Sequence, residues 1–212
     1  MQIRTRRSVV GAAVAAVLAA YARPFGVSLQ RRESITKLLR VVTGRNRAGK
    51  AIVLQRGVSP RVVTLETLPG LALVEVWATD RMPTLATAAD DITSTMTSFV
   101  PGPGGTRFRI VQFPGASSRA FDQEAFRREY RAKAPGLAET LELEDSAFHT
   151  TDTIDYGVVV SGEVTLELDD GATVSLKQGD CVVQNGTRHA WRNRRKAPCV
   201  MAFVLVGAAR EG

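Results

Sequence analysis

Short strand patterns separated by turn residues fill the chain from Thr153 onward, and they limit the fold more than any other feature. Runs of β-branched and aliphatic residues alternate with turn sequences such as Ser161-Gly162 and Asn185-Gly186. Short strands at this close, regular spacing indicate a β-sandwich or a small barrel. We therefore expect an all-β fold for this part of the chain.

The preceding segment continues the strand pattern and adds one helix. Residues 121–134 have acidic residues early and basic residues late, which suits the dipole of a helix. Residues 81–105 are rich in Thr, Ala and Asp and end in Pro-Gly-Pro-Gly-Gly, so we expect a loop there. The further expected strands are short aliphatic runs bounded by Gly, Pro, Asn or Ser: residues 40–43, 51–55, 61–65, 71–78 and 106–113.

The positive charge of the chain is concentrated at its start. The net charge is +7, from 28 basic and 21 acidic residues among 212. Residues 1–32 hold six Arg and no acidic residue, so the remainder has 22 basic against 21 acidic residues. A phosphate-binding surface needs a basic patch on the folded domain, so we do not expect nucleic acid as a partner. We also expect no membrane span, because no apolar run reaches about 18 residues.

Residues 1–34 have the composition of a leader, and we set them apart from the fold. Arg6-Arg7 before a weakly apolar stretch is similar to a twin-arginine export signal, and Ala20-Tyr21-Ala22 is a pattern that signal peptidase cuts. An organelle transit peptide or a start assigned too far upstream fits the same residues. We expect a disordered or helical leader and a cytoplasmic protein, with twin-arginine export as the alternative.

Two local features are expected to be structural. Residues 44–50 nearly spell a phosphate-binding loop, but Ala51 stands where that motif needs a hydroxyl for Mg²⁺, and a strand pattern follows where it needs a helix. A hairpin turn is therefore expected. Cys181 and Cys199 lie in strand-like runs without ligand spacing, so we expect buried free thiols.

The only two histidines, His149 and His189, lie in segments of specific composition. Residues 149–163 read HTTDTIDYGVVVSGE, and residues 179–193 read GDCVVQNGTRHAWRN. A strand points alternate side chains to one face, so His149 and Thr151 face the same way. Asp155 can join them after the chain turns into the next strand, whereas His189 can meet them only if the sheet closes on itself.

The first segment resembles the first signature motif of the cupin superfamily. His149 takes the first ligand position of that motif, Asp155 its carboxylate position and Gly162 its closing glycine. Two residues depart from the usual pattern, since Thr151 replaces the second histidine and Asp155 stands where Glu is commoner. The resemblance implies metal binding by fewer side chains than in cupins with four ligands.

The second segment resembles the second cupin motif at Gly186, His189 and Asn193. The resemblance covers about residues 105–207 and implies a double-stranded β-helix, or jelly-roll barrel, with extra N-terminal strands and one short helix. The chain divides accordingly into a leader (1–34), N-terminal strands and a loop that pack on the barrel (35–104), and the barrel (105–212). It is also similar to small single-domain cupins, including cupin oxidoreductases of polyketide and salicylaldehyde-type biosynthetic clusters. Homodimers are common among cupins, so a homodimer is expected by analogy.

Two imidazoles and one carboxylate form a ligand set that suits Fe(II), and Mn or Zn would also bind. We therefore expect His149, Asp155 and His189 as metal ligands. Thr151, Tyr156 and Trp191 are candidates for the substrate pocket, although Tyr156 and Trp191 also fit a core. Arg107 and Arg109 alternate on a strand and could face a carboxylate substrate, but a solvated strand face is the expectation.

The leading functional hypothesis is a metal-dependent cupin enzyme that acts on a small, oxygen-rich organic molecule. Oxidoreductase chemistry is favoured, while decarboxylation and isomerisation fit the same ligands, because the fold does not fix the reaction. The alternative is a non-enzymatic cupin that binds a small molecule without metal. A third reading is a structural partner in a homodimer without any ligand.

Overall fold

The computed structural model describes residues 34–85, 91–117 and 121–210. The expected leader lies outside these residues except for Ser34, so the predictions of location and export stay predictions. Within the described segments, no helix combines the length and the apolar character needed to cross a bilayer.

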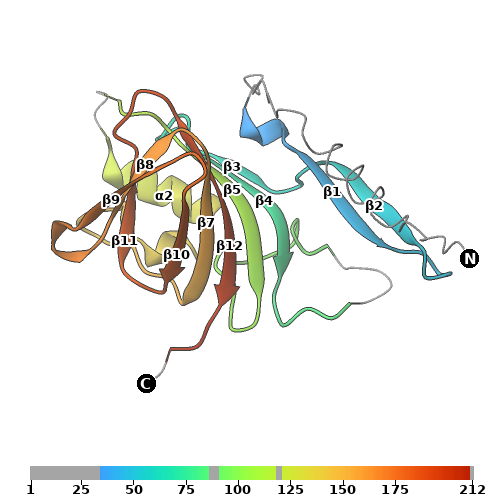
Figure 1. The fold of residues 1–212 in the computed structure, drawn as a ribbon. Helices are drawn as coiled ribbons and strands as arrows, with labels where there is room; N and C mark the ends of the chain where they lie inside the picture. The colour runs from blue at the N-terminus through green and yellow to red at the C-terminus, as the bar shows by residue number, and fades with distance from the viewer. Residues whose placement is uncertain (1–33, 86–90, 118–120, 211–212) are drawn as a thin grey trace, which may run out of the picture. The chain divides into compact units, whose positions relative to one another are not determined.

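Two antiparallel sheets make up the body of the protein, as expected for an all-β cupin barrel (Figure 1). The six-stranded sheet has the order β10-β7-β12-β5-β4-β3, and the four-stranded sheet has the order β6-β11-β8-β9. Apolar residues of both sheets form one core cluster, which includes Met201 of β12 and Leu166 of β8. The strands of the two sheets are β3 (Val62–Thr64), β4 (Ala72–Thr79), β5 (Thr106–Phe113), β6 (Phe148–His149), β7 (Thr153–Ser161), β8 (Glu163–Glu167), β9 (Thr173–Lys177), β10 (Cys181–Asn185), β11 (His189–Arg192) and β12 (Cys199–Gly207).

Strict alternation along β7 and β12 decides which side chains reach the interior. Odd-numbered residues of both strands point inward, so Val159 and Met201 are 1% and 0% exposed. Even-numbered residues point outward, and Tyr156 is 53% exposed. Because the side-chain period of a strand is two, this register fixes the lining of the interior.

Gly162 makes the tight connection between β7 and β8. Its φ of 80° lies in the left-handed region, where a side chain is strained. A Cβ at this position would also lie 2.6 Å from the carbonyl oxygen of Pro198. The closing glycine of the first motif thus lets two backbone segments approach each other at the end of the hairpin.

Helix α2 (Gln123–Lys133) confirms the predicted helix and covers part of the core. Asp122 caps its start by accepting a hydrogen bond from the Ala125 N–H at 2.9 Å. Phe126 and Tyr130, four residues apart, share the buried face and stack with ring centroids 5.2 Å apart. The 3-10 helix η2 (Ala138–Thr140) follows.

Strands β1 (Leu39–Arg45) and β2 (Ala51–Val58) form a separate two-stranded hairpin after the short 3-10 helix η1 (Ile35–Lys37). The hairpin turn predicted in place of a phosphate-binding loop is confirmed, and the Asn46 side chain accepts hydrogen bonds from the Ala48 and Lys50 N–H groups, each at 3.0 Å. Every residue of β2 is exposed. Arg40 ties the hairpin to the rest of the protein through an ion pair with Asp91 at 2.8 Å.

Two expectations about burial were wrong. Cys181 is exposed, whereas Cys199 is a buried free thiol as expected. Cys181 lies opposite Val158 and shares the outward face of the sheet. Arg107 and Arg109 are not on a solvated face, because odd-numbered residues of β5 point inward and leave these side chains only 1% and 3% exposed.

Candidate active site

The two histidines lie next to each other in the four-stranded sheet. His149 on β6 and His189 on β11 are directly opposite in the antiparallel register. Their ring centroids are 4.3 Å apart with an interplanar angle of 51°. The barrel therefore brings together two imidazoles that are far apart in the sequence, as the motifs predicted.

Hydrogen bonds to the backbone set the tautomer of both rings. His149 Nδ1 lies 3.2 Å from the carbonyl oxygen of Ala147, and His189 Nδ1 lies 2.9 Å from that of Thr187. A carbonyl oxygen only accepts, so each Nδ1 carries the proton and donates it. The Nε2 atom of each ring then keeps its lone pair, which can accept a proton or ligate a metal ion.

Both imidazoles are neutral at physiological pH. Burial, and to a smaller extent the neighbouring His189 ring, lower the pKa of His149 to about 4. Burial also lowers the pKa of His189, which is 2% exposed. A histidine must be neutral to bind a metal ion, so the environment prepares both rings for that role.

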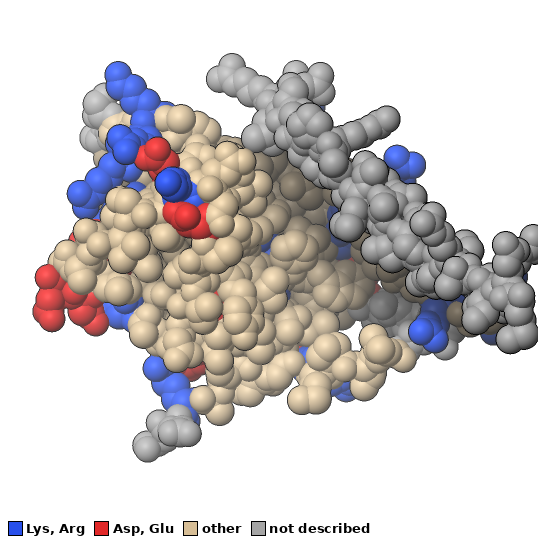
Figure 2. Space-filling model, in the orientation of Figure 1, with Lys and Arg blue, Asp and Glu red and all other residues tan. Residues whose placement is uncertain are grey.

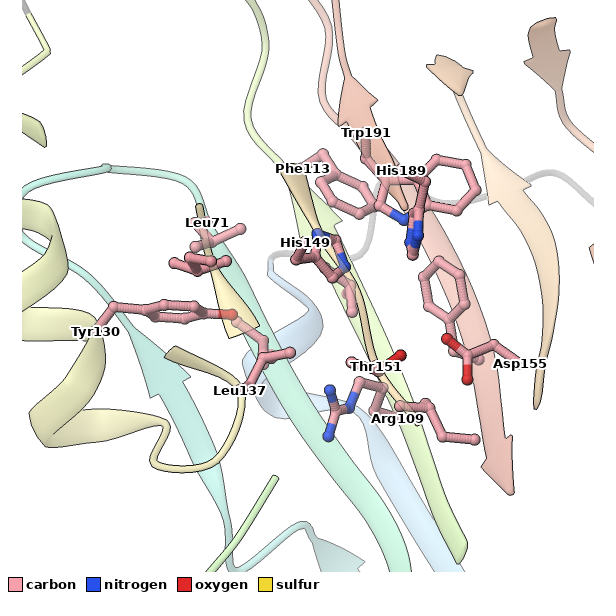
Figure 3. Close-up of a pocket in the computed structure, with 15 residues that line it drawn as sticks. Leu71, Arg109, Phe113, Tyr130, Leu137, His149, Thr151, Asp155, His189 and Trp191 are labelled. Carbon is pink, nitrogen blue, oxygen red and sulfur yellow. The ribbon is translucent and has the colours of Figure 1, made fainter. Parts of the chain in front are cut away.

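Asp155 and Thr151 line the same cavity as the two histidines (Figure 3). Asp155 points inward from β7 and is 8% exposed, and its Oδ1 has no hydrogen-bond partner. Burial raises the pKa of the Asp155 carboxyl, although the Thr153 hydroxyl opposes this change. The Thr151 hydroxyl lies 2.7 Å from that of Thr153.

The donor chemistry of this site fits a divalent ion, but the ligand set is not gathered around one point. Two free imidazole nitrogens and an unpartnered carboxylate oxygen face one cavity. Within the described ranges, however, no three His, Cys, Asp or Glu side chains lie close enough together to hold a metal ion. Aspartate is one methylene shorter than the usual glutamate, which limits the reach of Asp155. The set of His149, Asp155 and His189 therefore stays a prediction.

Aromatic side chains form one wall of the cavity. Trp191 packs edge-on against His189, with ring centroids 5.6 Å apart, and lies 6.2 Å from the Phe113 ring. Trp191 thus lines the cavity, which was one of the two positions considered for it, the other being the core. Tyr156 does not line it, because the register that turns Asp155 inward turns the next residue outward.

Two polar residues of the cavity were missed as site residues from the sequence. A solvated face was the expectation for Arg109, with contact to a carboxylate substrate as the alternative, and Tyr130 was only part of the expected helix, yet both line the cavity. In Figure 3 the Tyr130 hydroxyl points from α2 into the space between the sheets. The cavity occupies about 600 Å³, counting its open mouth. The spacing of Phe126 and Tyr130 on one helix face was the available signal for a buried tyrosine.

Comparison with known proteins identifies the domain that carries this site. Residues 140–206 match the family model described as "Cupin domain", and this range contains both histidines and Asp155. Residues 140–206 are a cupin domain. The family resemblance read from the two motifs is thereby confirmed.

Curated relatives of this cupin domain include proteins named for biosynthesis clusters and proteins named as oxidoreductases. "Phomopsin biosynthesis cluster protein C'" of Diaporthe leptostromiformis is 51% identical over 65 residues, which are 30% of this chain and 34% of that protein. The chain thus spans about a third of the relatives it matches at this level. "Cupin-domain-containing oxidoreductase fogC" of Aspergillus ruber is 23% identical over 188 residues, which are 86% of this chain and 78% of that protein.

The solved structures to which the chain is similar are more distant. The chain is 20% identical to the Cupin_2 domain of a transcriptional regulator from Enterobacter cloacae, with a TM-score of 0.31 and coverage of 49% of this chain and 83% of that one. A putative ethanolamine utilization protein from Salmonella typhimurium is 10% identical, with a TM-score of 0.38 and coverage of 82% and 99%.

Proposed function

We propose that the chain is a metal-dependent cupin enzyme that acts on a small, oxygen-rich organic molecule. The observation that carries the proposal is the pair of neutral imidazoles whose free Nε2 atoms open on a buried, aromatic-walled cavity. Relatives named as cupin-domain-containing oxidoreductases favour oxidoreductase chemistry. Decarboxylation and isomerisation remain the alternatives for the same residues.

His149 and His189 would hold the ion, with Asp155 as the carboxylate that faces the same cavity. Fe(II) is the favoured ion, and Mn or Zn would suit the same donors. When bound, such an ion polarises a substrate oxygen and stabilises negative charge that develops on it. The Nδ1–H donations to Ala147 and Thr187 keep both rings in the orientation that such a role requires.

The cavity walls position the substrate and exclude water. Trp191 and Phe113 offer an aromatic surface against which a flat molecule can pack. Burial raises the pKa of the Asp155 carboxyl, which lies in the same cavity and can contact the bound molecule. Water is excluded because the rest of the lining is mainly aliphatic and aromatic.

Metal analysis of the purified protein tests the proposal. We expect about one equivalent of Fe, Mn or Zn per chain, lost in His149→Ala and His189→Ala and reduced in Asp155→Asn. Asp152→Asn is the matched control, since Asp152 is 63% exposed and pairs with Arg210 outside the cavity. Full metal content in both histidine variants would contradict the assignment of the ligands.

A metal-free cupin that only binds a small molecule is the second candidate. It is favoured by the finding that the described side chains gather no group of three metal-binding residues. If added Fe(II) and Zn(II) leave the melting temperature of the metal-free protein unchanged, this candidate replaces the first.

We also propose that a second copy of the chain is a partner. Val183, Tyr156, Val204 and Phe108 lie side by side across β10, β7, β12 and β5, and they are 61%, 53%, 37% and 37% exposed. Figure 2 shows few charged side chains over β7, β10 and β12. Two copies related by a two-fold axis would cover this apolar strip with itself.

Light scattering during size exclusion tests the dimer. We expect a dimer for the natural chain and a monomer for Tyr156→Lys, whereas Thr173→Lys, at an exposed position on β9, should remain dimeric. A monomeric natural chain at micromolar concentration would overturn the proposal.

A further inference from the structure

Arg109 places a charged group in the wall of the cavity. Its side chain is 4% exposed and lines the same space as the two histidines. The Nε atom lies 2.8 Å from Glu75 Oε1, and Nη2 donates to the carbonyl oxygen of Phe99. Although it is close to Glu75, Arg109 Nε is among the buried side-chain atoms that lack a hydrogen bond of good geometry. A buried guanidinium with a free donor needs a partner.

Arg109 belongs to a cluster of buried charged side chains. Glu75 is 0% exposed, and the guanidinium groups of Arg109, Arg107 and Arg61 all act on it. The guanidinium carbons of Arg61 and Arg109 lie 5.1 and 5.7 Å from the centre of the Phe99 ring. Arg107 has its own acid, Asp80, at 2.8 Å. Several guanidinium groups therefore share Glu75, while Asp155, the carboxylate in the cavity lining, also interacts with Arg109.

The cavity is polar at one end and apolar at the other. In Figure 3 Arg109, Thr151 and Asp155 lie toward one end, Phe113 and Trp191 lie toward the other, and the two imidazoles lie between them. The remaining lining is aliphatic or aromatic, apart from the Tyr130 hydroxyl. A ligand that matches this arrangement has an anionic group at one end and a flat apolar body at the other.

We propose that the cavity binds a hydrophobic carboxylate, with Arg109 as the residue that receives the carboxylate and Trp191 and Phe113 as the wall for the apolar body. The inference deepens the proposed function, because it names the substrate class of the same cavity. It does not require the metal, since the guanidinium is positively charged at every physiological pH.

Calorimetric titration of the natural protein with cinnamate and cinnamamide tests the inference. These probes have the same size and differ in the charge of one end. Measured after removal of metal with EDTA, cinnamate should bind about tenfold more tightly, because charge-assisted hydrogen bonds are about twice as strong as neutral ones. Equal affinities, or tighter binding of the amide, would overturn the proposal.

Variants on one strand assign the selectivity to Arg109. Arg109→Gln should abolish the preference for cinnamate, whereas Arg107→Gln, two residues away and outside the cavity lining, should keep it. If circular dichroism shows that either variant fails to fold, the comparison of cinnamate and cinnamamide on the natural protein still tests whether the cavity prefers a carboxylate. His189→Ala should lose metal but retain the preference for the acid, which separates failure of this inference from failure of the metal proposal.

Discussion

Glu129 fastens helix α2, which carries Tyr130, to the loop before β4. Its carboxylate accepts hydrogen bonds from the N–H groups of Glu66 and Thr67, both at 2.9 Å, and from the Thr67 hydroxyl at 2.6 Å. Lys133 adds an ion pair at 2.8 Å, and the Glu129 side chain is 15% exposed. We predict that Glu129→Gln lowers the free energy of unfolding by about 2 kcal/mol at pH 7, because the charge that strengthens these bonds is lost.

The predicted loss depends on pH, with a definite sign. Burial raises the pKa of Glu129, but the hydrogen bonds from Lys133, Thr67 and the backbone outweigh it and lower the pKa to about 2. The unfolded chain has a pKa near 4.5, so the stabilising contribution of Glu129 is complete above that pH. It is lost as the pH falls toward 2, and the difference between natural protein and variant should shrink by about 1 kcal/mol at pH 3.5.

Urea unfolding at pH 7 and pH 3.5, followed by circular dichroism, measures both effects. Glu124→Gln on the same helix is the control, since Glu124 is 84% exposed and pairs only with Arg128 one turn away. That exposed pair should contribute less than about 0.5 kcal/mol. Equal losses for the two variants, or a Glu129→Gln loss that does not shrink at pH 3.5, would refute the reasoning.

Two further predictions concern the packing of β12. A methyl group in Gly207→Ala would overlap the backbone carbonyl of Gly102, which cannot move aside, so we expect a loss of about 3 kcal/mol in urea unfolding. Gly57→Ala, with no atom within 4 Å of the added carbon, should stay within about 1 kcal/mol of the natural protein. Met201→Ala removes a side chain that is 0% exposed and should lower the free energy of unfolding by about 3 kcal/mol, which a lower melting temperature would show. Met82→Ala, at a residue that is 77% exposed, should change the melting temperature little.

The sequence predicted the parts of the site that depend on local order. Alternation and turn residues were enough to expect an all-β body, and the two motifs were enough to expect His149 and His189 in one place. The distribution of charge was enough to expect a helix over residues 121–134, which the structure has over Gln123–Lys133. The strands and the helix depend on residues a few positions apart, whereas the meeting of the two histidines was expected from the resemblance to the cupin motifs.

Burial of the arginines could not be predicted in the same way. Arg109 on β5 is inside because Glu75, on the neighbouring β4, and Phe99, in the preceding loop, supply its partners. Alternating arginines on a strand otherwise indicate a solvated face, since an unpaired buried charge is costly. Whether such a residue is inside therefore depends on the pairing of two strands, which local patterns do not contain.

The strand register also explains why one pocket candidate lies in the cavity and another does not. Asp155 and Tyr156 are neighbours, and a shift of one residue would exchange their faces. Pairing of β7 with β12 sets Leu205 opposite Asp155 and Val204 opposite Tyr156, so the apolar pattern of β12 decides which of the two is buried. The motif identified Asp155 by its position, whereas the pattern around Tyr156 indicated only that it lay on a strand.

The charge of the ligand can be inferred independently of the metal. Burial lowers the pKa of both imidazoles, so neither carries a positive charge at physiological pH. Arg109 is the residue of the cavity lining whose side chain is positively charged at every physiological pH. A bound divalent ion would add positive charge to the same space, which strengthens the preference for an anion and does not reverse it. The selectivity between an acid and its amide thus follows from the protein alone, while the reaction depends on whether His149, Asp155 and His189 share an ion.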